Sequence, residues 1–171
     1  RLAMALAATL AVATAAPVRA EAPFDFATTP GVLPKDVVPV EYALHLRPDI
    51  GARSFGGTQT ITLDVLRPTS AIVMNALDLD VAAATLRGRH GRPTALPPPR
   101  PDASTQTIAF ALPAPIAPGR YTLTMSWRGT INRVVEGLYL DRQVDAAGEH
   151  LTLATDLEPT SARRVLPCWD E

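Results

Sequence analysis

The sequence is poor in the residues from which many functional sites are built. Cys168 is the only cysteine, which excludes an intrachain disulfide framework and a multi-cysteine zinc site. The three histidines, His45, His90 and His150, stand too far apart in the chain to form a local metal motif. Lys35 is the only lysine among 16 basic residues, and no run of basic residues occurs. A nucleic-acid groove therefore has no electrostatic basis.

Common catalytic motifs are absent as well. The sequence has no Gly-rich phosphate loop, no G-x-S-x-G elbow and no H-E-x-x-H helix motif. Hydrophobic residues make up 47% and charged residues 19% of the 171 residues, which argues against disorder and favours one ordinary domain. We interpret Asp78 and Asp80 as solvated edge residues, His45 as a solvated strand residue and His90 as a loop residue.

The first 20 residues have the composition of a targeting segment. Arg1 precedes an uncharged stretch from Leu2 to Ala16, and Val18-Arg19-Ala20 ends it with small residues. This pattern predicts a secretory signal peptide over residues 1–20 and an exported protein, periplasmic or secreted. The apolar stretch is shorter than the ~20 residues of a membrane span, so we expect no span after cleavage. The alternative is a buried N-terminal core helix.

The rest of the chain has the alternation of β-strands. Residues 21–32 are interpreted as an extended arm and residues 33–171 as one β domain. Apolar residues alternate with polar ones, often threonine, in runs near residues 42–46, 59–65, 77–81, 108–112, 121–127 and 150–154. The proline-rich stretch from Arg92 to Pro101 is interpreted as a long exposed hairpin loop. The pattern predicts an all-β, antiparallel β-sandwich or a large curved sheet.

The end of the chain resembles a known signature. Residues 155–171 read T-D-L-E-P-T-S-A-R-R-V-L-P-C-W-D-E. They are similar to T-Q-F-E-P-T-D-A-R-R-x-F-P-C-[FW]-D-E-P of the aminopeptidase N family of gluzincin zinc metallopeptidases. Three further stretches agree with that family, namely L-P-K with V-P-V-E-Y near residues 33–42, F-G-G at 55–57, and G-T-I-N followed by E-G-L-Y at 129–139.

The resemblance implies a fold, a larger parent protein and a cofactor. In that family this stretch is a saddle-like N-terminal β domain, placed against a thermolysin-like catalytic domain that binds zinc. The catalytic motifs G-x-M-E-N and H-E-x-x-H-x18-E do not occur in this sequence. We therefore expect a fragment, incomplete at its C-terminal end and inactive alone, whose parent removes N-terminal residues from peptides. Its expected partners are peptides with a free N-terminus and the catalytic domain of the same parent chain.

The resemblance also implies one substrate-binding residue. Glu158 matches the family position whose side chain binds the α-amino group of the substrate, and the alternative is an ordinary turn residue before Pro159. The family has glutamine where this chain has Asp156, which adds negative charge there. Arg163 and Arg164 are expected either to pair with Asp170 or Glu171 or to remain exposed.

Three expectations concern residues beside this position, and one rival hypothesis stays open. Cys168 is interpreted as a buried thiol, the alternative being a pair between chains. Trp169 is interpreted as a core residue, and Tyr139 is expected near the domain junction. The rival function is a free-standing exported β-sandwich that binds a ligand without catalysis. The downstream reading frame separates the two hypotheses, because an H-E-x-x-H motif about 150–200 residues further on would favour the enzyme.

Overall fold

The computed structural model describes residues 23, 25, 28, 31–89 and 91–170. The predicted signal peptide and most of the predicted arm lie outside the described residues, as do His90 and Glu171. Within the described part of the chain, no helix combines the length and the hydropathy that crossing a membrane requires.

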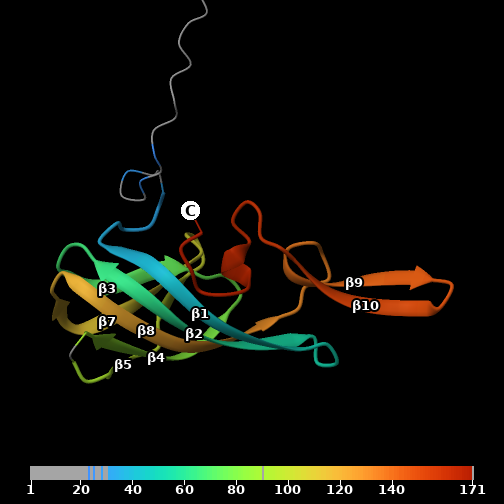
Figure 1. Cartoon of the computed structure of the whole chain (residues 1–171), viewed down its shortest axis with the longest axis horizontal. Helices are drawn as coiled ribbons and strands as arrows, with labels where there is room; N and C mark the ends of the chain where they lie inside the picture. The colour runs from blue at the N-terminus through green and yellow to red at the C-terminus, as the bar shows by residue number, and fades with distance from the viewer. Residues whose placement is uncertain (1–22, 24, 26–27, 29–30, 90, 171) are drawn as a thin grey trace, which may run out of the picture.

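The described residues form ten strands and one short 3-10 turn (Figure 1). In chain order they are β1 (Val37–Asp49), β2 (Ser54–Val65), β3 (Thr69–Asn75), β4 (Asp80–Gly88), β5 (Thr94–Leu96), β6 (Arg100–Asp102), β7 (Thr107–Ile116), β8 (Gly119–Thr130), β9 (Gly137–Asp145), β10 (Gly148–Asp156) and η1 (Ala162–Arg164).

The strands form three antiparallel sheets. A five-stranded sheet has the order β1-β2-β8-β4-β5, and a three-stranded sheet has the order β3-β7-β6. The hairpin of β9 and β10 is the third sheet and extends away from the other two (Figure 1). All strand pairs are antiparallel, so the predicted all-β antiparallel class is confirmed.

The two larger sheets share one apolar core. Ile61 of β2 and Leu123 of β8 come from the five-stranded sheet, and Ile72 of β3 and Phe110 of β7 come from the three-stranded sheet; each has an exposed fraction of 0%. Burial alternates residue by residue along β2. The period of two read from the sequence thus corresponds to one buried face and one threonine-rich outer face.

A close approach in the five-stranded sheet requires glycine at position 57. Gly57 is paired with Trp127 in the register of β2 and β8. A Cβ atom at Gly57 would lie 2.2 Å from Cζ2 of the Trp127 indole ring. The buried indole ring therefore occupies the space that a side chain at position 57 would need.

Two predicted segments differ from the structure. Residues 77–79 are not part of a strand: Asp78 has φ +57°, and β4 begins only at Asp80. The stretch from Arg92 to Pro101 is not one exposed loop, because it includes β5 and the start of β6, and Leu96 is buried. Both strands lie at sheet edges, where a proline without an N–H group is tolerated.

Candidate functional site

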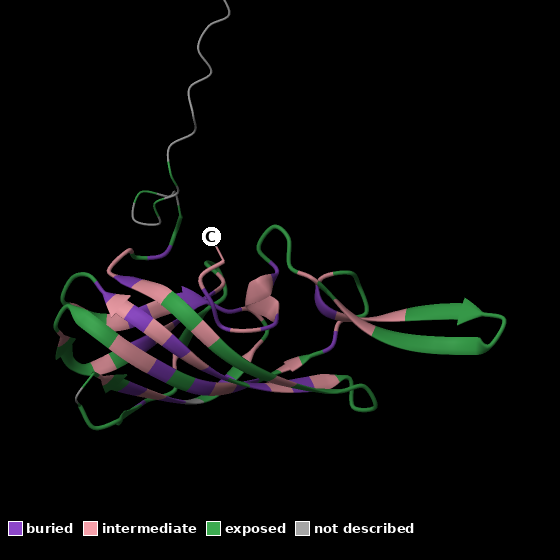
Figure 2. Cartoon of the chain, in the orientation of Figure 1, coloured by how far each residue is buried: buried purple, intermediate pink, exposed green. Residues whose placement is uncertain are grey.

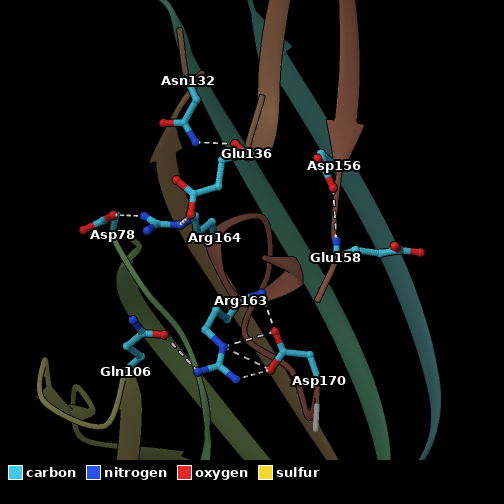
Figure 3. A network of polar contacts seen from close by, with 9 residues as sticks. All are labelled: Asp78, Gln106, Asn132, Glu136, Asp156, Glu158, Arg163, Arg164 and Asp170. Carbon is cyan, nitrogen blue, oxygen red and sulfur yellow. Dashed lines mark hydrogen bonds and ion pairs between the residues drawn. The ribbon is translucent and has the colours of Figure 1, made fainter. Parts of the chain in front are cut away.

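Glu158 lies in the segment after β10, residues 157–170, which leads from the hairpin back to the two larger sheets. Its backbone N–H donates a hydrogen bond to Oδ1 of Asp156 at 3.2 Å, and the peptide bond to Pro159 is cis. The Glu158 side chain is exposed and points away from the ion pairs of the neighbouring turn (Figure 3). Within the described residues its carboxylate has no ion-pair partner, so both oxygens remain free to accept hydrogen bonds.

The role of Asp156 in this structure is local. Its carboxylate accepts the hydrogen bond from the Glu158 amide and thereby caps the turn that begins there. The resembling family has a glutamine at this position, so Asp156 is an additional negative charge, as the sequence predicted. It lies two residues from Glu158. Two carboxylates at one turn make this end of β10 acidic.

Arg163 forms an ion pair with Asp170, which was one of the two alternatives predicted for it. Nη2 of Arg163 lies 2.9 Å from Oδ1 of Asp170, and the two side chains are 11% and 10% exposed. The backbone N–H of Arg163 also donates to Oδ2 of Asp170 at 3.0 Å, and Nη1 donates to Oε1 of Gln106 at 3.0 Å (Figure 3). These bonds fold the segment between residues 163 and 170 into a closed turn.

Among the described residues Arg164 does not pair with Asp170, and the other expected partner, Glu171, lies outside them. Its guanidinium pairs with Asp78 and, through Nε, with Oε1 of Glu136 at 2.9 Å (Figure 3). The reason is the geometry of η1: successive residues of a 3-10 turn point about 120° apart, so Arg163 and Arg164 reach different partners. Asp78, interpreted from the sequence as a solvated edge residue, is largely exposed and nevertheless serves as a partner of Arg164.

Buried polar side chains of the sandwich bind the same segment, and the sequence interpretation missed them. Nε2 of Gln59 donates to the backbone oxygen of Pro167 at 2.7 Å. Nε1 of Trp127 donates to the backbone oxygen of Val165 at 2.8 Å. Both side chains lie on the buried faces of β2 and β8, which the alternation predicted to be apolar. The one hint in the sequence was an amide, Gln59, at a position where that pattern calls for an apolar residue.

The opposite sheet holds the segment as well. Asn75, the last residue of β3, exchanges two backbone hydrogen bonds with Cys168, at 2.8 and 2.9 Å. From β1 of the five-stranded sheet, the Tyr42 hydroxyl accepts a hydrogen bond from the backbone N–H of Trp169 at 3.2 Å. Residues 165–169 are therefore bound by both sheets.

Cys168 and Trp169 have the positions expected for residues of the core. Cys168 is a buried free thiol. Burial raises its pKa, and the negative charge of Asp170 raises it further. A thiol that keeps its proton is a poor nucleophile. Trp169 is half-buried and packs against the core cluster.

The described residues do not fit a metal site. No group of three His, Cys, Asp or Glu side chains within them is arranged to hold an ion. His45 is exposed on β1, and His150 lies 3.0 Å from the carboxylate of Asp145 in the β9–β10 hairpin.

One face of the hairpin carries a strip of four apolar side chains, with the ion pair of Arg142 and Glu149 lying among its outer members. Leu140 faces Leu153 across the hairpin, and both are half-buried against the core. Further out on the same face, Leu151 is 48% and Val144 is 72% exposed. Figure 2 shows this change from half-buried residues at the base of the hairpin to exposed residues at its tip.

Comparison with known proteins agrees with this arrangement. The model of the Peptidase M1 N-terminal domain matches residues 38–171. The chain is 36% identical over 162 residues to "Aminopeptidase N" of Acetobacter pasteurianus, covering 94% of this chain and 44% of that protein. It is 36% identical over 140 residues to "Aminopeptidase M1-D" of Oryza sativa subsp. japonica, covering 81% of this chain and 16% of that protein.

A human protein is similar over the same region. The chain is 32% identical over 147 residues to human "Endoplasmic reticulum aminopeptidase 1", covering 81% of this chain and 15% of that protein. The chain thus spans less than half the length of each of these relatives. Because the family model matches most of the chain, including the Glu158 segment, the chain belongs to the M1 peptidase family and corresponds to its N-terminal domain.

Proposed function

We propose that this domain is part of an exported zinc aminopeptidase and that Glu158 binds the α-ammonium group of the peptide substrate. The single observation that carries the proposal is the placement of Glu158, whose exposed, unpartnered carboxylate stands on a segment that both sheets of the sandwich hold in place. Membership of the M1 family supports the aminopeptidase activity of the parent protein. Residues 1–20 support export by their composition.

The chemistry of a carboxylate suits this role. An ammonium group and a carboxylate form charge-assisted hydrogen bonds, which are about twice as strong as neutral ones. A peptide whose N-terminus is acetylated has no ammonium group and leaves the carboxylate unpaired, so the same contact excludes blocked substrates. The turn at Asp156 adds a second negative charge nearby and increases the attraction for a cationic N-terminus.

The second part of the proposal is that the domain closes one side of the active site. The remaining part of the parent protein would supply the zinc ligands and the catalytic groups, because the described residues do not fit a metal site. The strip formed by Leu140, Leu153, Leu151 and Val144 supports a docking face for that part, because it continues from the core to exposed positions.

The experiment uses the purified full-length parent protein and two peptides that differ only in N-terminal acetylation. The proposal predicts release of the first residue from the free peptide and none from the acetylated peptide. Equal cleavage of both peptides would contradict the α-amine contact. Absence of any cleavage by the zinc-loaded parent would instead favour the rival hypothesis of an exported binding module.

A further inference from the structure

The position of Glu158 depends on how residues 157–170 are attached to the sandwich. The β9–β10 hairpin before this segment pairs with neither of the larger sheets, and its outer half is exposed (Figure 2). The base of the hairpin is held by the bridge between Asn132 and Tyr139 and by the packing of Leu140 and Leu153 against the core. The bonds between residues 157–170 and the core add to this support and act directly on the segment that carries Glu158.

We propose that Gln59 is a positioning residue, which acts on the substrate through the placement of Glu158. The inference rests on the proposed function of Glu158. Gln59 lies in the middle of β2, on the inward row that also contains Ile61 and Leu63, and is 1% exposed. Its amide donates to the backbone oxygen of Pro167 at 2.7 Å and lies 3.4 Å from Sδ of Met125.

A buried amide among the apolar side chains of β2 reduces the stability of the fold unless its hydrogen bonds are replaced. The bond from Gln59 to the segment therefore points to a role beyond core packing. Burying an amide costs free energy unless its hydrogen bonds are replaced, and an apolar residue of the same size avoids that cost. The bond to Pro167 compensates the Nε2 group and fixes one backbone oxygen of the segment. Among the described residues its Oε1 is buried without a partner, so the bond to Pro167 is the favourable contact that the amide gains over an apolar side chain.

A second donor beside Gln59 restrains the segment in the same way. Trp127 lies on β8, which pairs with β2, and donates to the oxygen of Val165, two residues before Pro167. Gln59 and Trp127 thus bind the carbonyls on either side of Leu166, in the turn that follows η1. Two bonds from neighbouring strands attach this turn to the five-stranded sheet.

Further contacts carry this restraint back towards Glu158. The N–H of Leu77 donates to the oxygen of Arg163 at 2.9 Å. The N–H of Ser161, a buried residue, donates to the oxygen of Leu157 at 3.0 Å and closes the turn that contains Glu158. Between these contacts, the N–H of Leu166 donates to the oxygen of Ala162 at 3.1 Å and that of Arg164 donates to the oxygen of Ser161 at 3.1 Å. Backbone hydrogen bonds thus connect the residue before Pro167 to the base of the turn that presents the carboxylate.

The test separates positioning from general stability in the full-length parent protein. Gln59→Met keeps the length of the side chain and removes the donor, and Gln59→Asn keeps the amide but shortens its reach. Ile61→Val, on the same inward row, is the control for lost core packing. The probes are two hydroxamate inhibitors that differ only in the α-amine, and inhibition constants are measured together with kcat and KM.

We expect Gln59→Met to raise the inhibition constant of the amine-bearing hydroxamate about 2- to 13-fold, the range of one lost hydrogen bond. The amine-free hydroxamate should keep its affinity, and Ile61→Val should change neither value. Gln59→Asn should behave as Gln59→Met does, and it tests the proposal if the Met variant does not fold. In a Glu158→Ala background the effect of Gln59→Met should disappear.

Three outcomes would overturn the inference. Equal weakening of both inhibitors would show a general loss of structure. An effect of Gln59→Met that persists in full without Glu158 would show action through another group. A normal response to Glu158→Ala together with an unchanged Gln59→Met variant would refute the role of Gln59 and leave the proposed function intact, whereas unchanged kinetics in Glu158→Ala would refute the proposed function itself.

Discussion

Arg163 and Asp170 form a nearly buried ion pair that closes the turn after Glu158. The guanidinium and the carboxylate are 2.9 Å apart, and the carboxylate also accepts the backbone N–H of Arg163. The pair lies seven residues apart in the chain and spans the stretch that the sandwich core binds. It therefore joins the two ends of the stretch that the core binds.

Removing one partner of this pair should destabilise the domain. Arg163→Ala leaves the Asp170 carboxylate, which is 10% exposed, without its counter-charge. We expect a loss of about 2–4 kcal/mol in the free energy of unfolding, towards the lower end of the range for buried pairs. Arg120→Ala, at an exposed pair with Asp64, is the control and should cost far less. Chemical denaturation of both variants measures the difference, and equal small losses would contradict this account.

Adding a methyl group at Gly57 should also destabilise the domain. The new Cβ atom would lie 2.2 Å from the Trp127 ring, which is buried and bound to Val165. We expect Gly57→Ala to cost about 1–3 kcal/mol, as overpacking of a core does. The neighbouring Gly56→Ala meets its nearest atom at 3.8 Å and should be close to neutral. Similar melting temperatures for the two variants would show that the indole moves aside without cost.

The stability of the domain should fall in alkaline solution. Burial raises the pKa of the Cys168 thiol and that of the Tyr42 hydroxyl, so the fold keeps both protons at a pH where the unfolded chain releases them. This stabilisation is complete below about pH 8.5, the ordinary pKa of a thiol, and is lost as the pH rises beyond it. Unfolding free energies from pH 7 to 10.5 measure the slope. Cys168→Ala should delay its onset towards pH 10, and an unchanged onset would exclude the thiol as its cause.

The chain of 171 residues alone should neither hold zinc nor cleave peptides. Its described residues do not form a group of metal ligands, and its three histidines are dispersed in the sequence. Metal analysis after dialysis and release of an amino acid from a chromogenic substrate are the two measurements. Stoichiometric zinc together with such release would contradict the assignment of catalysis to other parts of the parent protein.

The sequence predicts the strands better than it predicts the contacts of the candidate site. Alternation in β2 and β8 is a local property, so it can be read without the fold. The bonds of Gln59 to Pro167 and of Arg164 to Asp78 join residues 108 and 86 positions apart, and no local pattern encodes them. The position of Glu158 came from the resemblance of residues 155–171, whereas its support by Gln59 and Trp127 becomes visible only in three dimensions.

The central claim is that the Glu158 carboxylate binds the α-ammonium group of the substrate, and the kinetics of Glu158→Ala in the parent protein test it most directly. A charge-assisted contact of about 1.5–3 kcal/mol predicts a loss of roughly 10- to 150-fold in kcat/KM for peptides with a free amine. Glu158→Gln should lose less, because its amide oxygen still accepts a hydrogen bond, and zinc content should remain at the wild-type level. Unchanged kcat/KM in a folded Glu158→Ala protein would contradict the claim.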